Sequence, residues 1–191
     1  NKKNQLSIES NYSVIIFPTD MLTNDSFEKG GEGWYTVNYN INFLKACLFL
    51  AKKNPEIDFK FKLKDYNQID IINQNNSFKK LNLDAYNNFK IIERGRMNYL
   101  DLVLEADIAI SIGYTSPGLD ALLLNKKSIY FSDLKNAGNA FKKIPYFVAE
   151  NQDNLISIFN KSINNKIEYT NKDLLDPYQD GKAIKRIVNH L

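Results

Sequence analysis

Two short runs of the chain are almost entirely apolar, a pattern that predicts strands buried on both faces of a sheet. They lie at residues 14–17, ended by Pro18, and at residues 108–112, ended by Gly113. Such strands are typical of parallel sheets, because helices cover both faces of those sheets. We therefore expect both runs inside a parallel sheet.

A third run, at residues 58–66, alternates apolar and polar positions. Its phenylalanines would face one way, and Lys60, Lys62 and Lys64 the other. This alternation predicts a strand with one face in solvent.

Apolar residues recur at helical spacing over residues 41–55, with Lys52 and Lys53 in the last turn and Pro55 as the stop signal. The other expected helices lie at residues 98–106, 116–125, 152–165 and 181–191, with a weaker helical pattern over 67–88, and the other expected strands lie at 88–93, 127–133 and 146–151. Strands that alternate with helices predict an α/β fold, a doubly wound, mostly parallel, Rossmann-like sheet with helices on both faces. We expect residues 1–191 to form one such domain.

Composition narrows the class of protein. The chain of 191 residues is 43% hydrophobic and 25% charged, values of a globular protein rather than a disordered one. Its net charge of +3, spread along the chain, argues against a nucleic-acid partner. No apolar run approaches the roughly 18 residues of a membrane span. The single cysteine, Cys47, is expected in the core and fits a cytoplasmic setting. The single histidine, His190, lies next to the C-terminus, which argues against histidine-based catalysis and histidine-rich metal sites within this chain.

The segment from Gly113 to Gly118 joins the second buried run to a predicted helix, and its residues suit an anion site. Ser116 is a good N-cap, and Pro117 suits the first turn because its missing N–H would be unsatisfied there anyway. Gly118 would let a ligand approach the backbone without a side chain in the way. Ligands of open α/β sheets bind at this edge, where helix N-termini attract anions such as a diphosphate.

Asp120 lies one turn into the same helix, where a carboxylate can accept hydrogen bonds from ribose hydroxyls. The alternative is purely structural: Ser116 caps the helix, and Asp120 complements its dipole. The local pattern leaves both interpretations open.

Residues 116–131 resemble the nucleotide-sugar-binding stretch of GT-B glycosyltransferases and of the non-hydrolysing UDP-sugar 2-epimerases. Leu119-Asp120-Ala121-Leu122 falls where that family usually has Leu-Glu-Ala-Met, and Asn125 where it usually has Gly. The resemblance implies that Thr115, Ser116 and Gly118 contact the donor's phosphates. It implies a ribose contact from Asp120.

Two further stretches, residues 88–111 and 176–191, are similar to this family in the same order, so that the resemblance covers roughly half of the chain. In the family, the loop after the strand expected here at 88–93 lies near the base. The resemblance therefore implies four base-proximal residues: Arg94, Gly95, Arg96 and Met97.

The chain departs from the family's pattern at two places. Retaining GT-B enzymes often carry a glutamate where this chain has Ile112, and the epimerases and glycerophosphate transferases often carry a His-Pro pair that residues 61–68 lack. Lys62 and Lys64 could supply the phosphate-binding charge instead, although lysines on the wet face of a strand are usually just solvated. The first departure argues against the common retaining class with two glutamates. The missing histidine favours a transferase over an epimerase, and a CDP-glycerol-type glycerophosphotransferase lobe is a further alternative.

A glycine-rich loop follows the first strand and would rim the same cleft as Gly113 and Tyr114. Gly31 could let this loop close over a donor, and Glu32 is a weak candidate for catalysis. A mobile surface loop is an equal alternative.

The resemblance implies the C-terminal, donor-binding lobe of a two-lobe GT-B glycosyltransferase for surface polysaccharides such as capsule or lipopolysaccharide. The catalytic base and the glycan or lipid-linked acceptor would then belong to an absent N-terminal lobe, and this lobe alone would be inactive. Since the sequence has no Asp-x-Asp pair, we expect no metal and no cofactor, only the nucleotide-activated sugar. The full-length enzyme would be cytoplasmic and able to associate peripherally with the inner face of the membrane.

Overall fold

The computed structural model describes residues 12–20, 36–93, 95, 97–113, 115–132, 141–167 and 182. Its strands are β1 Ser13–Phe17, β2 Asp58–Lys62, β3 Phe89–Ile92, β4 Ile108–Ile112, β5 Lys127–Phe131 and β6 Val148–Ala149. Its α-helices are α2 Val37–Lys53, α3 Asn67–Gln74, α4 Asn76–Lys79, α5 Tyr99–Glu105, α6 Ser116–Leu123 and α7 Gln152–Ile163, and its 3-10 turns are η2 Leu83–Ala85 and η3 Phe141–Lys143.

The strands form one sheet in the order β3-β2-β1-β4-β5-β6, and every neighbouring pair is parallel. In this register Val14 lies between Phe59 of β2 and Ile108 of β4. The chain thus begins at the centre, winds outward to β3 and returns to β4. This order is doubly wound, with its switch point between β1 and β4, and it confirms the Rossmann-like fold class predicted from the sequence.

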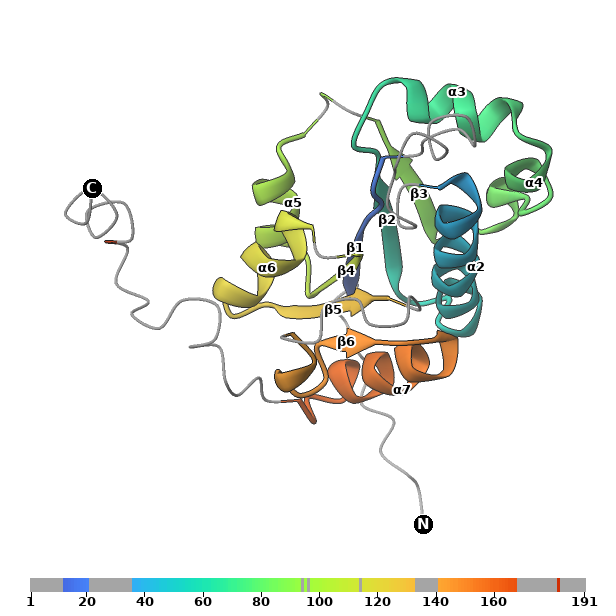
Figure 1. Cartoon of the computed structure of the whole chain (residues 1–191). Coiled ribbons are helices and arrows are strands. Elements are labelled where there is room, and N and C mark those ends of the chain that lie inside the picture. The colour runs from blue at the N-terminus through green and yellow to red at the C-terminus, as the bar shows by residue number, and fades with distance from the viewer. Residues whose placement is uncertain are drawn as a thin grey trace, which may run out of the picture.

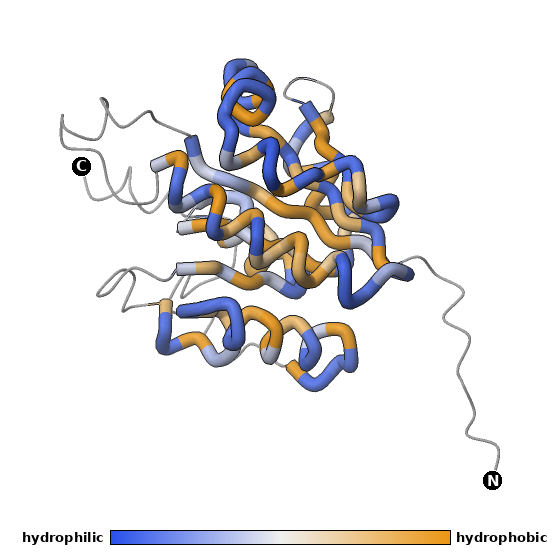
Figure 2. Tube along the Cα trace, turned by 90° about the vertical axis from the view of Figure 1, so that its right-hand side faces the viewer, coloured by the Kyte–Doolittle hydropathy of each residue, from blue (hydrophilic) through white to orange (hydrophobic). Residues whose placement is uncertain are grey.

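Helices cover both faces of the sheet (Figure 1), with α2 and α7 on one side and α5 and α6 on the other. The larger core lies under α2 and α7 and includes Phe43, Phe59 and Phe159, all fully buried. The smaller core lies under α5 and α6 and includes Ile15, Val103 and Ala121. Figure 2 shows the apolar strands flanked by helices whose colours alternate between polar and apolar. Each helix therefore buries one stripe and exposes another.

Helix α2 begins four residues before the predicted start at residue 41, because Thr36 caps it: the Thr36 hydroxyl accepts a hydrogen bond from the Tyr39 N–H at 3.2 Å. It ends after Lys53, as predicted. Cys47 is fully buried in this helix, and burial raises the pKa of its thiol. Cys47 is therefore a core residue, as expected, and a poor nucleophile.

The strand β2 corrects one prediction. Its alternation holds for Phe59 and Phe61, but Lys62 is only 7% exposed and does not lie on a solvent-exposed face. Apart from Lys182, the predicted helix at 181–191 lies outside the described residues.

Candidate functional site

A cavity of about 600 Å³ lies at the carboxyl ends of β1 to β4, at the switch point of the sheet. It is lined by Phe17 and Pro18 after β1, by residues 62–64 at the end of β2, by Gly95 and residues 97–99 before α5, and by residues 115–117 at the start of α6. Four separate segments thus converge where ligands of open α/β sheets bind. Both predicted lysines, Lys62 and Lys64, lie on its wall.

Lys62 reaches the cavity as a buried cation. Its Nζ donates to the carbonyl oxygens of Leu63 at 3.1 Å and of Glu93 at 2.9 Å. Such hydrogen bonds offset part of the cost of burying an ammonium group. They also hold the charge in one place, whereas a solvated lysine would move freely.

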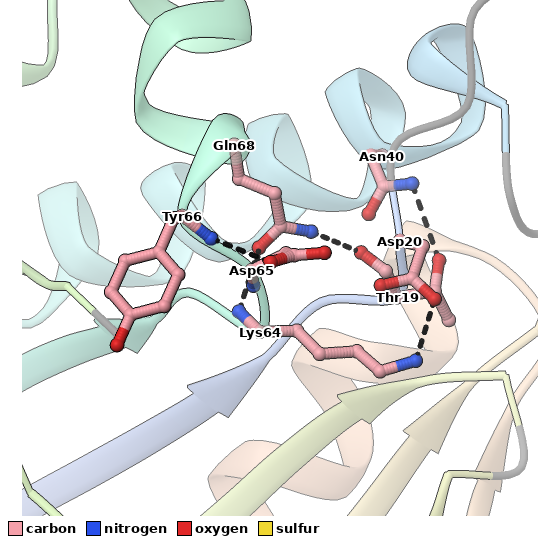
Figure 3. Close-up of polar contacts among 7 residues, drawn as sticks. All are labelled: Thr19, Asp20, Asn40, Lys64, Asp65, Tyr66 and Gln68. Atoms are coloured by element: carbon pink, nitrogen blue, oxygen red, sulfur yellow. Dashed lines mark hydrogen bonds and ion pairs between the residues drawn. The ribbon is translucent and has the colours of Figure 1, made fainter. Parts of the chain in front are cut away.

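Lys64 is half exposed, and its Nζ lies 2.7 Å from Oδ2 of Asp20 in the segment after β1. Figure 3 shows that this ion pair borders a polar network around Gln68. Gln68 Nε2 donates to the carbonyl of Thr19 at 2.7 Å, and its Oε1 accepts from the Lys64 N–H at 2.6 Å. Asn40 of α2 donates to the Thr19 hydroxyl at 3.3 Å. The network ties the segment after β1 to the segment after β2, so it fixes the wall on which Lys64 sits.

The start of α6 forms the opposite wall. The sequence predicts Ser116 as the N-cap, but the N-cap is Thr115, and Ser116 is the first helical residue. No side chain caps the helix, and the Thr115 hydroxyl is buried without a hydrogen-bond partner among the residues described. Gly113 turns the chain with φ of 60°. Helix N-termini attract anions through first-turn N–H groups. Among the first three residues of α6 only Ser116 can offer one, because Pro117 has no N–H and the Gly118 N–H donates to the Thr115 carbonyl.

Gly118 serves packing rather than ligand approach, which corrects a second prediction. A Cβ on Gly118 would lie 2.0 Å from Cε1 of the Tyr130 ring and 2.9 Å from the Ser111 hydroxyl. The Gly118 N–H donates to the Thr115 carbonyl at 3.2 Å, and its carbonyl accepts from the Ser128 hydroxyl at 2.7 Å. Gly118 is not among the residues that line the cavity. It lets α6 lie close to β4 and β5, and we remove it from the phosphate contacts.

Asp120 also lies behind the cavity wall rather than on it. Its Oδ2 accepts a hydrogen bond from the Tyr99 hydroxyl at 3.0 Å, and Tyr99 lines the cavity. This hydrogen bond, burial and the negative charge of Asp120 raise the pKa of Tyr99. A direct ribose contact from Asp120 stays a prediction.

The base-proximal loop is described only in part. Gly95 has φ of 83°, and a Cβ there would lie 3.0 Å from the Tyr66 hydroxyl, so a glycine suits both its backbone and its surroundings. Met97 lines the cavity and is partly exposed. Arg94, Arg96, Tyr114, Gly31 and Glu32 lie outside the described residues.

Sequence reasoning missed Tyr99, Asp20 and Gln68. The sequence held a signal for Asp20, because this residue lies just after the end of a predicted buried strand. The sequence held no such signal for Tyr99, because its hydrogen-bond partner Asp120 is 21 positions away.

Within the residues that the structure describes, no three His, Cys, Asp or Glu side chains gather as a metal site would require. Among the same residues, no helix has the length and apolar character to span a membrane. The expectation that the site works without a metal stays a prediction.

Residues 1–159 match the family model of polysaccharide biosynthesis PFTS motif proteins. The chain belongs to this family. No curated protein matches it significantly.

Solved structures show the fold. The UDP-GlcNAc 2-epimerase from Neisseria meningitidis bound to UDP-GlcNAc is similar with 18% identity and a TM-score of 0.55, over 96% of this chain and 46% of that one. The UDP-GlcNAc 2-epimerase from Methanocaldococcus jannaschii, in complex with UDP-GlcNAc and UDP, has 14% identity and a TM-score of 0.55, over 94% and 45%. A putative epimerase from Listeria monocytogenes has 13% identity and a TM-score of 0.54, over 94% and 44%.

The chain thus spans about half the length of these solved structures. Together with the family match, they confirm the resemblance stated from the sequence: this is a GT-B-like α/β domain of polysaccharide biosynthesis.

Proposed function

We propose that this domain binds the nucleotide-activated sugar of a metal-independent glycosyltransferase that builds a surface polysaccharide. The observation that carries the proposal is the cavity at the switch point, with Lys62, Lys64 and the start of α6 on its wall. A nucleotide sugar carries its negative charge on phosphates, which ammonium groups and helix N-termini attract. The volume of about 600 Å³ also suits a small-molecule ligand.

The family's own description supports a role for the α6 wall. It names a PFTS motif, and this chain has Gly113-Tyr114-Thr115-Ser116 at the junction before α6. The last two residues agree, an aromatic residue precedes them in both, and the chain has no other Thr-Ser pair. We infer that this segment is a variant of the motif and that Thr115 and Ser116 meet the phosphate.

The chemistry follows from these charges. In glycosyl transfer the bond between the sugar and the phosphate oxygen breaks, and negative charge builds on the departing nucleotide. Lys62, Lys64 and the Ser116 N–H at the start of α6 would stabilise that charge. We expect the base that activates the acceptor, and the glycan or lipid-linked acceptor itself, on a second lobe. Cytoplasmic location and peripheral membrane association of the full-length enzyme belong to the same proposal.

A second candidate is an epimerase-like enzyme, which the fold of the solved structures favours. A UDP-sugar 2-epimerase needs no acceptor, so incubating the full-length protein with UDP-GlcNAc alone separates the two. Formation of the 2-epimer without acceptor would replace the transferase proposal. A glycerophosphotransferase lobe would instead prefer CDP.

Calorimetry without metal tests donor binding directly. The chain is titrated with UDP, CMP, CDP, GDP and ADP, beside a Lys64→Ala variant. We expect one of these nucleotides to bind in the micromolar-to-millimolar range. The variant should bind about ten- to hundredfold more weakly, because a charge-assisted phosphate contact is worth about 1.5–3 kcal/mol.

Lys142→Ala is the matched control, because Lys142 also forms an ion pair, with Glu150, and lies away from the cavity. Both variants lower the net charge equally. Equal weakening in both would mean that general charge, not the cavity, attracts the nucleotide, and would contradict the proposal.

A further inference from the structure

The hydroxyl of Tyr99 is a polar group of the cavity that the sequence did not indicate. Tyr99 is the first residue of α5, where Asn98 caps the helix by accepting the Leu100 N–H at 3.0 Å. The cap fixes the backbone from which Tyr99 extends. Tyr99 lines the cavity and is 37% exposed, so a ligand can reach it.

The direction of its hydrogen bond decides what Tyr99 can offer a ligand. An ionised carboxylate has no proton to give, so in the contact with Asp120 the Tyr99 hydroxyl must be the donor. The phenol has only one proton. Its oxygen therefore presents lone pairs, and no donor, to any further partner.

We propose that Tyr99, rather than Asp120, meets the nucleotide, and that its oxygen accepts a hydrogen bond from a ribose hydroxyl. Asp120 is then a positioning residue that acts through Tyr99. The inference rests on the proposed function, since it assumes that the cavity holds a nucleotide. It replaces the direct ribose contact that the sequence suggested for Asp120.

An acceptor-only group also orients the ligand. Phosphate oxygens are acceptors as well, so the Tyr99 oxygen repels them, whereas Lys62 and Lys64 attract them. A nucleotide thus enters with its phosphates toward the lysines and α6, and with a ribose hydroxyl toward α5. The alternative is that the Tyr99–Asp120 bond only fastens α5 to α6. That alternative predicts altered stability and unchanged ligand selectivity.

The test compares ribonucleotides with deoxyribonucleotides. UDP, CDP, GDP and ADP, each with its 2′-deoxy and 3′-deoxy form, are titrated by calorimetry into the chain and into Tyr99→Phe. One hydrogen bond is worth about 0.5–1.5 kcal/mol, so we expect the chain to prefer the ribonucleotide over one deoxy form by about three- to tenfold. Tyr99→Phe should lose this preference and bind both forms about equally.

Two substitutions of Asp120 test its positioning role. Asp120→Asn keeps an oxygen that can accept the Tyr99 proton, so the preference for ribose should persist. Asp120→Ala releases Tyr99, and the preference should shrink. Tyr146→Phe is the matched control, because Tyr146 is about as exposed as Tyr99 and lies away from this cavity.

The outcomes separate the inference from the proposed function. If a nucleotide binds and Tyr99→Phe keeps the ribose preference, the inference is wrong and the proposed function stands. If the folded chain binds no nucleotide, both are overturned.

Discussion

On the β4 side of the cavity, α6 packs so closely on the sheet that Gly118 has no room for a side chain, whereas on the β1–β2 side buried amides hold two loops together. The first wall depends on shape, with Tyr130 filling the space against Gly118 and its hydroxyl donating to the Thr115 carbonyl. The second depends on satisfied hydrogen bonds, centred on Gln68.

The difference suits what each wall offers a ligand. A helix N-terminus binds an anion through backbone groups, so its position must be fixed by close packing. A lysine is long and flexible, so the loop that carries it needs polar anchors. We therefore expect substitutions in the first wall to act mainly through volume, and those in the second through lost partners.

The largest effect on stability is expected from Gly118→Ala. Its Cβ would meet the fully buried Tyr130 ring at 2.0 Å, and overpacking of this kind costs up to about 3 kcal/mol. Urea denaturation measures the change in the free energy of unfolding. Combining it with Tyr130→Leu should cost less than the sum of the two single changes, because the leucine leaves room for the new methyl group. If the two changes in the free energy of unfolding were strictly additive, the Tyr130 ring would not be what limits the space at Gly118.

Gln68→Ala should cost about 2 kcal/mol, because it leaves the buried Thr19 carbonyl and the Lys64 N–H without their partner. It should also weaken nucleotide binding, since the loop that carries Lys64 loosens. Gln74→Ala in the same helix is the control, because Gln74 is exposed. A stability loss as small as that of the control would mean that the network does not hold this wall.

Tyr130→Phe keeps the ring that packs against Gly118 and removes only the hydroxyl bonded to the Thr115 carbonyl. We expect a loss of about 1 kcal/mol in stability. Nucleotide affinity should fall by more than the loss of stability alone would cause, because the start of α6 loses the hydrogen bond that holds the Thr115 carbonyl. Calorimetry and urea denaturation on the same sample separate the two effects, and unchanged affinity would argue that packing alone positions α6.

The smallest effect is expected at the hydrogen bond between Tyr99 of α5 and Asp120 of α6. The pKa of Tyr99 is raised above its ordinary value of 10.0, chiefly by the hydrogen bond to Asp120. The stability that this bond adds is therefore present at neutral pH and lost as the pH rises above about 10 through the raised pKa. Asp120→Ala should bring the pKa of Tyr99 back down, as NMR of labelled tyrosine ring carbons would detect. An unchanged pKa in this variant would show that Asp120 does not raise the pKa of Tyr99.

The sequence predicts most of the fold, because the fold depends on local patterns. The apolar runs of β1 and β4 and the helical spacing of α2 are visible within ten to fifteen residues. Asn125 has φ of 60°, in the left-handed region that asparagine tolerates, which agrees with the glycine that the family resemblance implies at this position.

The site was predicted less well, because the roles of the mispredicted residues depend on contacts with residues far away in the sequence. The sequence predicts a solvated Lys62, whereas in the fold its Nζ donates to the carbonyl of Glu93, 31 positions later. Gly118 looks like a ligand contact until Tyr130 is packed against it. Neither partner can be identified from a single sequence.

The central claim is that nucleotide binds at the switch-point cavity. A second cavity of about 450 Å³ lies elsewhere, beside Lys52, Tyr86 and Asn88. Backbone amide shifts in ¹⁵N NMR, followed during titration with the best-binding nucleotide, decide between them. The account predicts the largest shifts at residues 62–64, 97–99 and 115–116. Largest shifts at residues 85–88, or shifts spread evenly over the surface, would contradict it.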